Sequence, residues 1–252
     1  MSSGISLPII GFGTYRIKTI EPILNAIKIG YRHFDTAELY HNEHLVKQVI
    51  NKYHDKIYVT TKISKKSIFN NHIEKSFYER INIFGYIDVL LLHVPSKDCK
   101  KDWQTLVELY KKNKNRIGHI GVSNYDIQDL DQIKDSEIKP EYNQIELSPF
   151  FVRQELVQYC HNNNIKIIAH TSLTNATKLN DYNLQIMANK YTISSAELLL
   201  SWAIKKGFHI IPKSENIIHM KQNLNIKNNI SDDDVNELDT YDEKYHLIKI
   251  KN

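Results

Sequence analysis

The stretch that decides the fold is "IDVLLLHV", residues 87–94. Apart from Asp88 and His93 it is an unbroken aliphatic run, which is typical of a strand buried on both faces, as in a parallel sheet. Segments with apolar residues at every third or fourth position, the helical period, separate it from its neighbours, for example at 102–112. Comparable strand-like runs occur at 9–17, 33–37, 57–63, 117–124, 142–148, 165–173 and 208–212.

These runs give eight candidate strands that alternate with helix-like segments within 252 residues. That number and that length favour a (β/α)8 TIM barrel formed by a single domain, residues 1–252. We expect residues 5–9 to form a short β-hairpin at the bottom of the barrel, and Ser194 and Glu197 to form a capping box at a helix start. The alternative is a doubly wound open sheet, but "GFG" at 11–13 lacks the third glycine of its nucleotide-binding fingerprint.

Charge and composition exclude several classes of protein. The 33 Lys and Arg residues nearly balance the 29 Asp and Glu residues, which argues against a nucleic-acid partner. No apolar run is long enough to cross a bilayer, and the N-terminal residues lack the features of a signal peptide, so we expect no membrane partner. Cys99 and Cys160 form no CxxC motif, which favours a reducing compartment. We therefore expect a cytoplasmic protein, and we expect a monomer.

Ionisable residues follow three consecutive candidate strands at the point where each strand ends. Asp35 ends the second strand, Lys62 the third and His93 the fourth, and Tyr40 lies in the loop five positions after Asp35. Each residue alone has an ordinary structural interpretation, such as a helix cap for the Asp or a rim position for the Lys. Barrel enzymes, however, place their chemistry at the carboxyl ends of the strands, where these four side chains would meet. Their co-location therefore predicts an active site.

Six short motifs, in order along the chain, resemble those of the aldo-keto reductase family. Together with matching residues before and after them, the motifs extend from residue 11 to residue 223, nearly the whole chain, and together they are specific although each is weak alone. The motifs are "GYRHFDTAELYHNE" (30–43), "VTTKI" (59–63), "DVLLLHVP" (88–95), "IGVSN" (120–124), "NQIELSPF" (143–150) and "IIPKS" (210–214).

The resemblance implies NADPH-dependent reduction of a small-molecule carbonyl substrate, an aldehyde or a ketone, to an alcohol. It implies that Tyr40 donates the proton, that the Lys62 ammonium lowers the pKa of Tyr40 and stabilises its phenolate, and that Asp35 holds Lys62. His93 would orient the substrate oxygen. The substrate-binding residues implied by the resemblance are Tyr15, Tyr40, His93 and Val94.

The resemblance also implies a set of cofactor-binding residues. These are Gly13, Thr14, Tyr15, Asp35, Ser123, Asn124, Gln144, His170, Thr171, Leu173, Lys213, Ser214, His219, Gln222 and Asn223. Four positions depart from the family pattern. His170 stands where the family has a Tyr that stacks on the nicotinamide, His219 where it has an Arg at the 2′-phosphate, and Gln222 where it has a Glu. Val94 replaces a frequent Trp. We therefore expect NADPH as cofactor, with NADH possible and a weaker preference than usual.

Three other functions are compatible with parts of the sequence. The chain could be a non-catalytic nucleotide-binding barrel of the same family. It could be a Schiff-base aldolase with Lys62 as the nucleophile, although this leaves Tyr40 and Gln144 unexplained. His41 and His44 are spaced for a metal, but an ordinary helix start is the simpler interpretation, and we expect no metal.

Overall fold

The computed structural model describes residues 7–227 and 229–248. Its eight strands form one sheet in the order of the sequence, from β1 to β8, and every neighbouring pair is parallel. The strands are β1 Phe12–Gly13, β2 His33–Asp35, β3 Tyr58–Ile63, β4 Ile87–Leu92, β5 Ile117–Ser123, β6 Tyr142–Glu146, β7 Lys166–His170 and β8 His209–Ile210.

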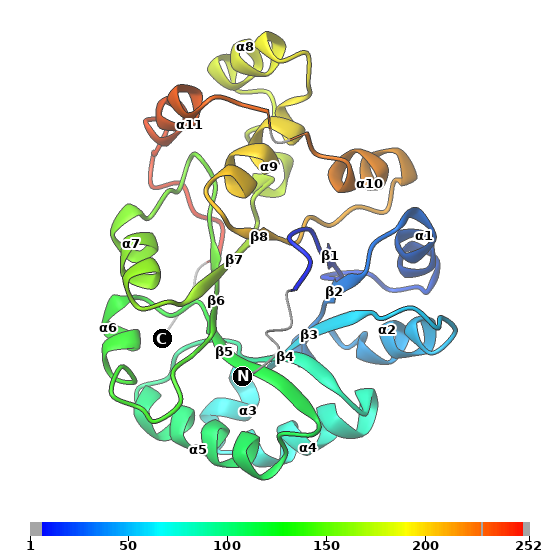
Figure 1. Ribbon diagram of the computed structural model, residues 1–252, viewed down its shortest axis with the longest axis vertical. Helices are drawn as coiled ribbons and strands as arrows, with labels where there is room; N and C mark the ends of the chain where they lie inside the picture. The colour runs from blue at the N-terminus through cyan, green and yellow to red at the C-terminus, as the bar shows by residue number, and fades with distance from the viewer. Residues whose placement is uncertain (1–6, 228, 249–252) are drawn as a thin grey trace.

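The last strand meets the segment that enters the first. Ile10 forms a parallel bridge with Ile210, the Gly11 N–H donates to Ile210 O over 2.8 Å, and the Ile210 N–H donates to Ile9 O over 2.8 Å. The sheet therefore curls round on itself, and Figure 1 shows the strands ringed by helices. The (β/α)8 barrel predicted from the alternating runs is confirmed.

The first strand is shorter than the run at 9–17 predicts. The chain turns directly after β1, where the Ile17 N–H donates to Thr14 O and Arg16 adopts a left-handed φ of 64°. The hairpin predicted at 5–9 lies partly outside the described residues. Its described part, residues 7–9, has no strand, and Ile10 pairs in parallel with β8.

The helices alternate with the strands and cover the outside of the barrel. In Figure 1, α8 and α11 lie farther from the sheet than α9 does. The predicted capping box is confirmed, because Ser194 and Glu197 exchange both hydrogen bonds at the start of α9. No helix in the described part of the chain is long and apolar enough to cross a membrane. The helices are α1 Glu21–Ile29, η1 Glu38–Tyr40, α2 Glu43–Ile50, α3 Lys65–Phe69, α4 Ile73–Phe84, α5 Cys99–Lys112, α6 Ile127–Asp131, α7 Gln154–Asn162, η2 Thr174–Ala176, α8 Tyr182–Lys190, α9 Ser195–Lys205, α10 Ile217–Leu224 and α11 Asp232–Asp239.

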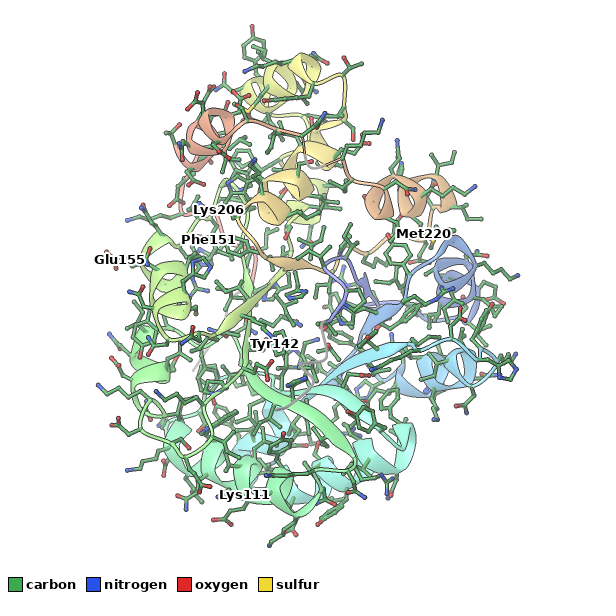
Figure 2. The ribbon with its side chains drawn as sticks, viewed as in Figure 1. Lys111, Tyr142, Phe151, Glu155, Lys206 and Met220 are labelled. Carbon is green, nitrogen blue, oxygen red and sulfur yellow. The ribbon has the colours of Figure 1, made fainter. Side chains whose placement is uncertain are left out.

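Alternation along each strand divides the apolar side chains between two clusters. The larger cluster fills the space between the sheet and the helices, and it includes Phe34 and Leu90. The smaller contains Val89, Leu91 and Tyr142, and Figure 2 shows Tyr142 within the ring of strands. Because successive side chains of a strand point to opposite faces, residues an even number of positions from Leu91, such as His93, face the inside of the barrel. This alternation directs the polar residues at the strand ends toward one another.

Candidate active site

A cavity of about 1380 Å³ opens at the carboxyl ends of the strands. Nearly all the site residues expected from the sequence line it. The exceptions are Lys62, which is completely buried beneath it, and Thr14. The expected residues that line it are Gly13, Tyr15, Asp35, Tyr40, His93, Val94, Ser123, Asn124, Gln144, His170, Thr171, Leu173, Lys213, Ser214, His219, Gln222 and Asn223.

A buried ion pair lies beneath the cavity. Lys62 Nζ donates to Asp35 Oδ1 over 2.6 Å and to the carbonyl oxygen of Thr36 over 2.9 Å. The second carboxylate oxygen, Asp35 Oδ2, accepts from Gln144 Nε2 over 2.7 Å. An ammonium has three N–H donors, and Lys62 Nζ lies 5.1 Å from the centre of the Tyr40 ring. The third donor is therefore available to Tyr40.

Burial and charge act in opposite directions on this pair. Burial raises the pKa of Asp35, and the charge of Lys62 only partly offsets that rise. Burial alone would lower the pKa of Lys62, but the charge of Asp35 and hydrogen bonds with Asp35 and Tyr40 raise it above its ordinary value. Lys62 is therefore a protonated ammonium at neutral pH.

Tyr40 ends η1 and faces Tyr15 and His93. The Tyr40 and Tyr15 ring centres lie 5.0 Å apart, and those of Tyr40 and His93 lie 5.9 Å apart with the rings edge to face. Burial raises the pKa of the Tyr40 phenol, while the charge of Lys62 and a hydrogen bond with Lys62 lower it. Lys62 thus lowers the pKa of Tyr40, as expected. Desolvation of the phenolate is the larger effect, however, so the pKa of Tyr40 lies above its ordinary value.

A partly buried charge network that the sequence analysis missed fixes the turn that carries Tyr40. The carboxylate of Glu38 accepts hydrogen bonds from the Ser64 N–H over 2.8 Å and from Ser76 Oγ over 2.7 Å. Arg80, from α4, lies 3.2 Å from Glu38 Oε2 and 3.0 Å from Glu43 Oε2. In the sequence, Glu38 and Glu43 on either side of Tyr40 in "AELYHNE" could have indicated such a network. Their partner Arg80, however, comes close to them only in the folded chain.

Thr14 takes a structural position rather than a place on the cavity wall. Its Oγ1 donates to Asp35 O over 2.9 Å. Asn42, a second residue that the sequence analysis missed, donates through Nδ2 to Thr14 O and Ile17 O, over 2.7 and 3.0 Å. Thr14 therefore joins the loops after β1 and β2, and its predicted contact with the cofactor stays a prediction. The neighbouring Gly13 does line the cavity, and a side chain there would come within 2.6 Å of Ile211 O.

His93 presents a neutral imidazole to the cavity. Burial, followed by the nearby charge of Lys62, lowers the pKa of His93 to about 3. Its Nδ1 is buried and, within the described part of the chain, has no hydrogen-bond partner. A neutral imidazole keeps one N–H donor, so this ring can donate a hydrogen bond to an oxygen atom in the cavity.

Three amide and hydroxyl side chains expected at the nicotinamide carboxamide form one cluster. Asn124 Nδ2 donates to Ser123 Oγ and to His93 O, both over 3.0 Å, and Ser123 Oγ donates to Gln144 O over 2.9 Å. Both N–H groups of Asn124 are thus used within the protein. Among the described residues nothing donates to Gln144 Oε1, so this amide oxygen remains open to an N–H donor in the cavity.

His170, at the end of β7, completes this cluster. Its Nε2 lies 2.9 Å from Asn124 Oδ1, and its Nδ1 lies 2.9 Å from Thr171 Oγ1. Burial, followed by the charge of Lys62, lowers the pKa of His170 to about 3. The ring is therefore neutral, and both of its nitrogens form hydrogen bonds. One face of the ring could also stack on a ligand.

The adenosine end expected from the sequence lies between β8 and α10. Lys213 Nζ forms an ion pair with Glu215 Oε1 at 2.5 Å. The side chain of Asn216 caps α10 by accepting from the backbone N–H groups of Ile218 and His219. The His219 side chain is exposed and lines the cavity.

The C-terminal segment forms another part of the wall that the sequence analysis did not identify. The backbone N–H groups of Leu247 and Ile248 donate to the two carboxylate oxygens of Glu146, over 2.8 and 2.9 Å. Both residues line the cavity, as does Val94. These three residues give the cavity wall an apolar part, and Glu146 at the end of β6 holds the C-terminal segment in place.

A nicotinamide dinucleotide fits these donors and acceptors. Gln144 keeps an unoccupied acceptor close to the Asp35–Lys62 pair, and Lys213 supplies a cation at the far end of the same cavity. Among residues 7–227 and 229–248, no cluster of three His, Cys, Asp or Glu side chains suited to a metal ion occurs.

Comparison with known proteins agrees with this architecture. The model of the aldo/keto reductase family matches residues 10–243. An uncharacterized oxidoreductase of Schizosaccharomyces pombe is 34% identical, over 98% of this chain and 92% of its own length. The glyoxal reductase of Bacillus subtilis is 33% identical, over 95% of this chain and 90% of its own length. A crystal structure of an aldo/keto reductase from Brucella melitensis superposes with a TM-score of 0.86 at 32% identity, covering 96% of this chain and 98% of that one.

The chain therefore belongs to the aldo/keto reductase family. It is an NAD(P)H-dependent oxidoreductase that reduces carbonyl groups.

Proposed function

We propose that the protein reduces aldehydes or ketones to alcohols with NADPH as the preferred cofactor and Tyr40 as the proton donor. The observation that carries this proposal is the 2.6 Å Lys62–Asp35 ion pair beneath the Tyr40 ring. A phenol is a weak acid, and a buried ammonium beside it stabilises the phenolate that forms when the proton leaves. No other described part of the cavity wall combines these groups.

Each residue has a separate task in the reaction. A nicotinamide cofactor, when bound, would supply the hydride that the carbonyl carbon accepts. Tyr40 Oη transfers its proton to the carbonyl oxygen and becomes a phenolate, which the Lys62 ammonium stabilises and which solvent later reprotonates. Asp35 keeps Lys62 charged and in place, and the neutral ring of His93 donates a hydrogen bond that orients the carbonyl oxygen. Tyr40 is protonated at neutral pH, because burial raises its pKa, and the Lys62 ammonium stabilises the phenolate that remains once the proton has left.

The Schiff-base alternative is disfavoured by the state of Lys62. An amine nucleophile must be neutral to attack a carbonyl. Here Asp35 and Tyr40 hold the pKa of Lys62 above its ordinary value, and two of its donors are already engaged. Trapping with borohydride and a carbonyl substrate should therefore leave Lys62 unmodified.

The proposal is tested by following NADPH absorbance with a panel of carbonyl compounds. The panel should include p-nitrobenzaldehyde and, because a relative is named a glyoxal reductase, glyoxal. Consumption that depends on the added carbonyl is expected. If NADPH binds but no carbonyl is reduced, the alternative of a non-catalytic nucleotide-binding barrel is favoured.

We also propose that the enzyme acts as a cytoplasmic monomer. Both cysteines, Cys99 and Cys160, are free and buried, as expected in a reducing compartment. Size-exclusion chromatography with light scattering should give the mass of one chain, 29.5 kDa.

A further inference from the structure

An ion pair lies at the end of the cavity where the proposed function places the adenosine part of the cofactor. Lys213 Nζ and Glu215 Oε1 are 2.5 Å apart, across a single intervening residue. Lys213 lines the cavity, whereas Glu215 does not line it and reaches the site only through the Lys213 ammonium. The positive charge that faces the cavity is therefore already compensated by a carboxylate.

The remaining residues at this end supply little further positive charge. Lys213 is the only Lys or Arg in the group that was expected there, which consists of Lys213, Ser214, His219, Gln222 and Asn223. A phosphate monoester carries a charge of about −1.5 to −2 at neutral pH. To bind it, Lys213 must leave Glu215 or share its ammonium, and the carboxylate then stays close to a second anion. Like charges at this distance repel.

We propose that Glu215 is the residue that sets dinucleotide choice in this protein. Its carboxylate competes with the 2′-phosphate of NADPH for Lys213 and repels that phosphate. The unphosphorylated ribose of NADH meets no such competition, because it carries no charge that Glu215 could repel. NADH is therefore bound nearly as well as NADPH. This inference rests on the proposed function, which places the 2′-position of the cofactor at Lys213.

The decisive variant is Glu215→Gln, which removes the charge and keeps the size of the side chain. Dissociation constants are measured by calorimetry for NADPH and NADH, and for two fragments without nicotinamide, adenosine 2′,5′-bisphosphate and AMP. Exposed ion pairs have modest energies, so we expect the variant to bind NADPH and the bisphosphate about fivefold more tightly. Binding of NADH and AMP should change less than about twofold. The gain should shrink as salt screens the charges.

A matched control separates this local effect from the change in net charge. Glu137 pairs with Lys111 on the outside of the barrel, and that pair is similarly exposed, with 37% of Lys111 accessible against 36% of Lys213. Figure 2 shows Lys111 at the outer edge of the molecule, far from α10. Glu137→Gln should leave all four dissociation constants unchanged.

The outcomes distinguish the two proposals. If the native protein binds both dinucleotides but Glu215→Gln alters NADPH and NADH equally, or neither, the role of Glu215 is wrong and the proposed function stands. The same holds if Glu137→Gln reproduces the gain. If the native protein binds neither dinucleotide, both proposals are overturned.

Discussion

His170 Nε2 lies 2.9 Å from Asn124 Oδ1, and this contact fixes the tautomer of the imidazole. Both N–H groups of the Asn124 amide already donate, to Ser123 Oγ and His93 O, so its oxygen can only accept. His170 therefore carries its proton on Nε2, and its Nδ1 accepts from Thr171 Oγ1. A Tyr at this position could stack, but it could not bond on both sides in this way.

The first prediction concerns this bond. His170→Phe keeps a larger aromatic face but loses both hydrogen bonds, which leaves the Asn124 oxygen unpaired. Each neutral hydrogen bond contributes about 1 kcal/mol, so NADPH and NADH should both bind about five- to tenfold more weakly by fluorescence titration. Tighter binding would show that stacking area, rather than the position of Asn124, is the main contribution of residue 170.

The second prediction concerns the proton donor. Tyr40→Phe removes the hydroxyl and keeps the ring, so NADPH should bind normally while the turnover number for aldehyde reduction falls by at least about a hundredfold. Tyr182→Phe is the matched control, because Tyr182 is exposed on α8 and should be silent. Near-normal turnover in Tyr40→Phe would remove this residue from the mechanism.

The third prediction concerns the buried ion pair. Removing one partner of such a pair leaves a charge buried without compensation and typically costs about 3–5 kcal/mol. Lys62→Met should therefore lower the free energy of unfolding by several kcal/mol in urea titrations. The double variant Lys62→Met with Asp35→Asn should be more stable than Lys62→Met alone, because no net charge remains buried. Equal losses in the single and double variants would contradict this account.

The fourth prediction concerns stability at acid pH. Burial, followed by the charges of His209 and Lys62, lowers the pKa of His33 to about 3, whereas in the unfolded chain a His titrates near 6.5. Between these values the unfolded chain binds one more proton at this residue than the native protein does. The contribution of His33 to the free energy of unfolding should therefore be fully present above about pH 6.5. It should decrease as the pH falls toward 3, by up to about 1.4 kcal/mol per pH unit.

His33→Gln tests that contribution. Between pH 4 and 6, the unfolding free energy of the variant should depend less steeply on pH than that of the native protein. The difference in slope should reach the equivalent of one bound proton, about 1.4 kcal/mol per pH unit, whatever the stability of the variant at pH 7. His33 Nε2 bonds Thr60 Oγ1 at 2.9 Å, and the Gln amide can replace that contact. An unchanged slope would mean that His33 does not titrate between the native and unfolded states.

The fifth prediction concerns the substrate. Val94, Leu247 and Ile248 give the cavity an apolar wall, so bulky aromatic aldehydes should be reduced with higher kcat/KM than small polar sugars. Val94→Trp should narrow the space and reverse part of this preference. The expected change is about 10- to 100-fold in the ratio of kcat/KM for p-nitrobenzaldehyde to that for glyoxal, the range of hydrophobic discrimination. A strong preference of the native enzyme for one small sugar would contradict the prediction.

The sequence by itself determined the barrel and most of the cavity wall. Eight buried strands in one chain have few other parallel arrangements, and their carboxyl ends must meet. Side-chain alternation then fixes which residues face inward, so Asp35, Lys62 and His93 could be brought together from their positions in the strands alone.

Only the tertiary structure decided how these groups are supported and how they ionise. Arg80 contacts Glu38 and Glu43 across helices that are distant in sequence, and the pairing of Glu146 with the C-terminal segment spans about a hundred residues. The upward shift in the pKa of Tyr40 could not be read from its distance in sequence to Lys62. Desolvation depends on everything that covers the phenol, and the charge of a neighbour acts against that background. Local sequence patterns specify strands and helices. The burial of a side chain and its contacts with residues distant in sequence depend on the complete tertiary structure.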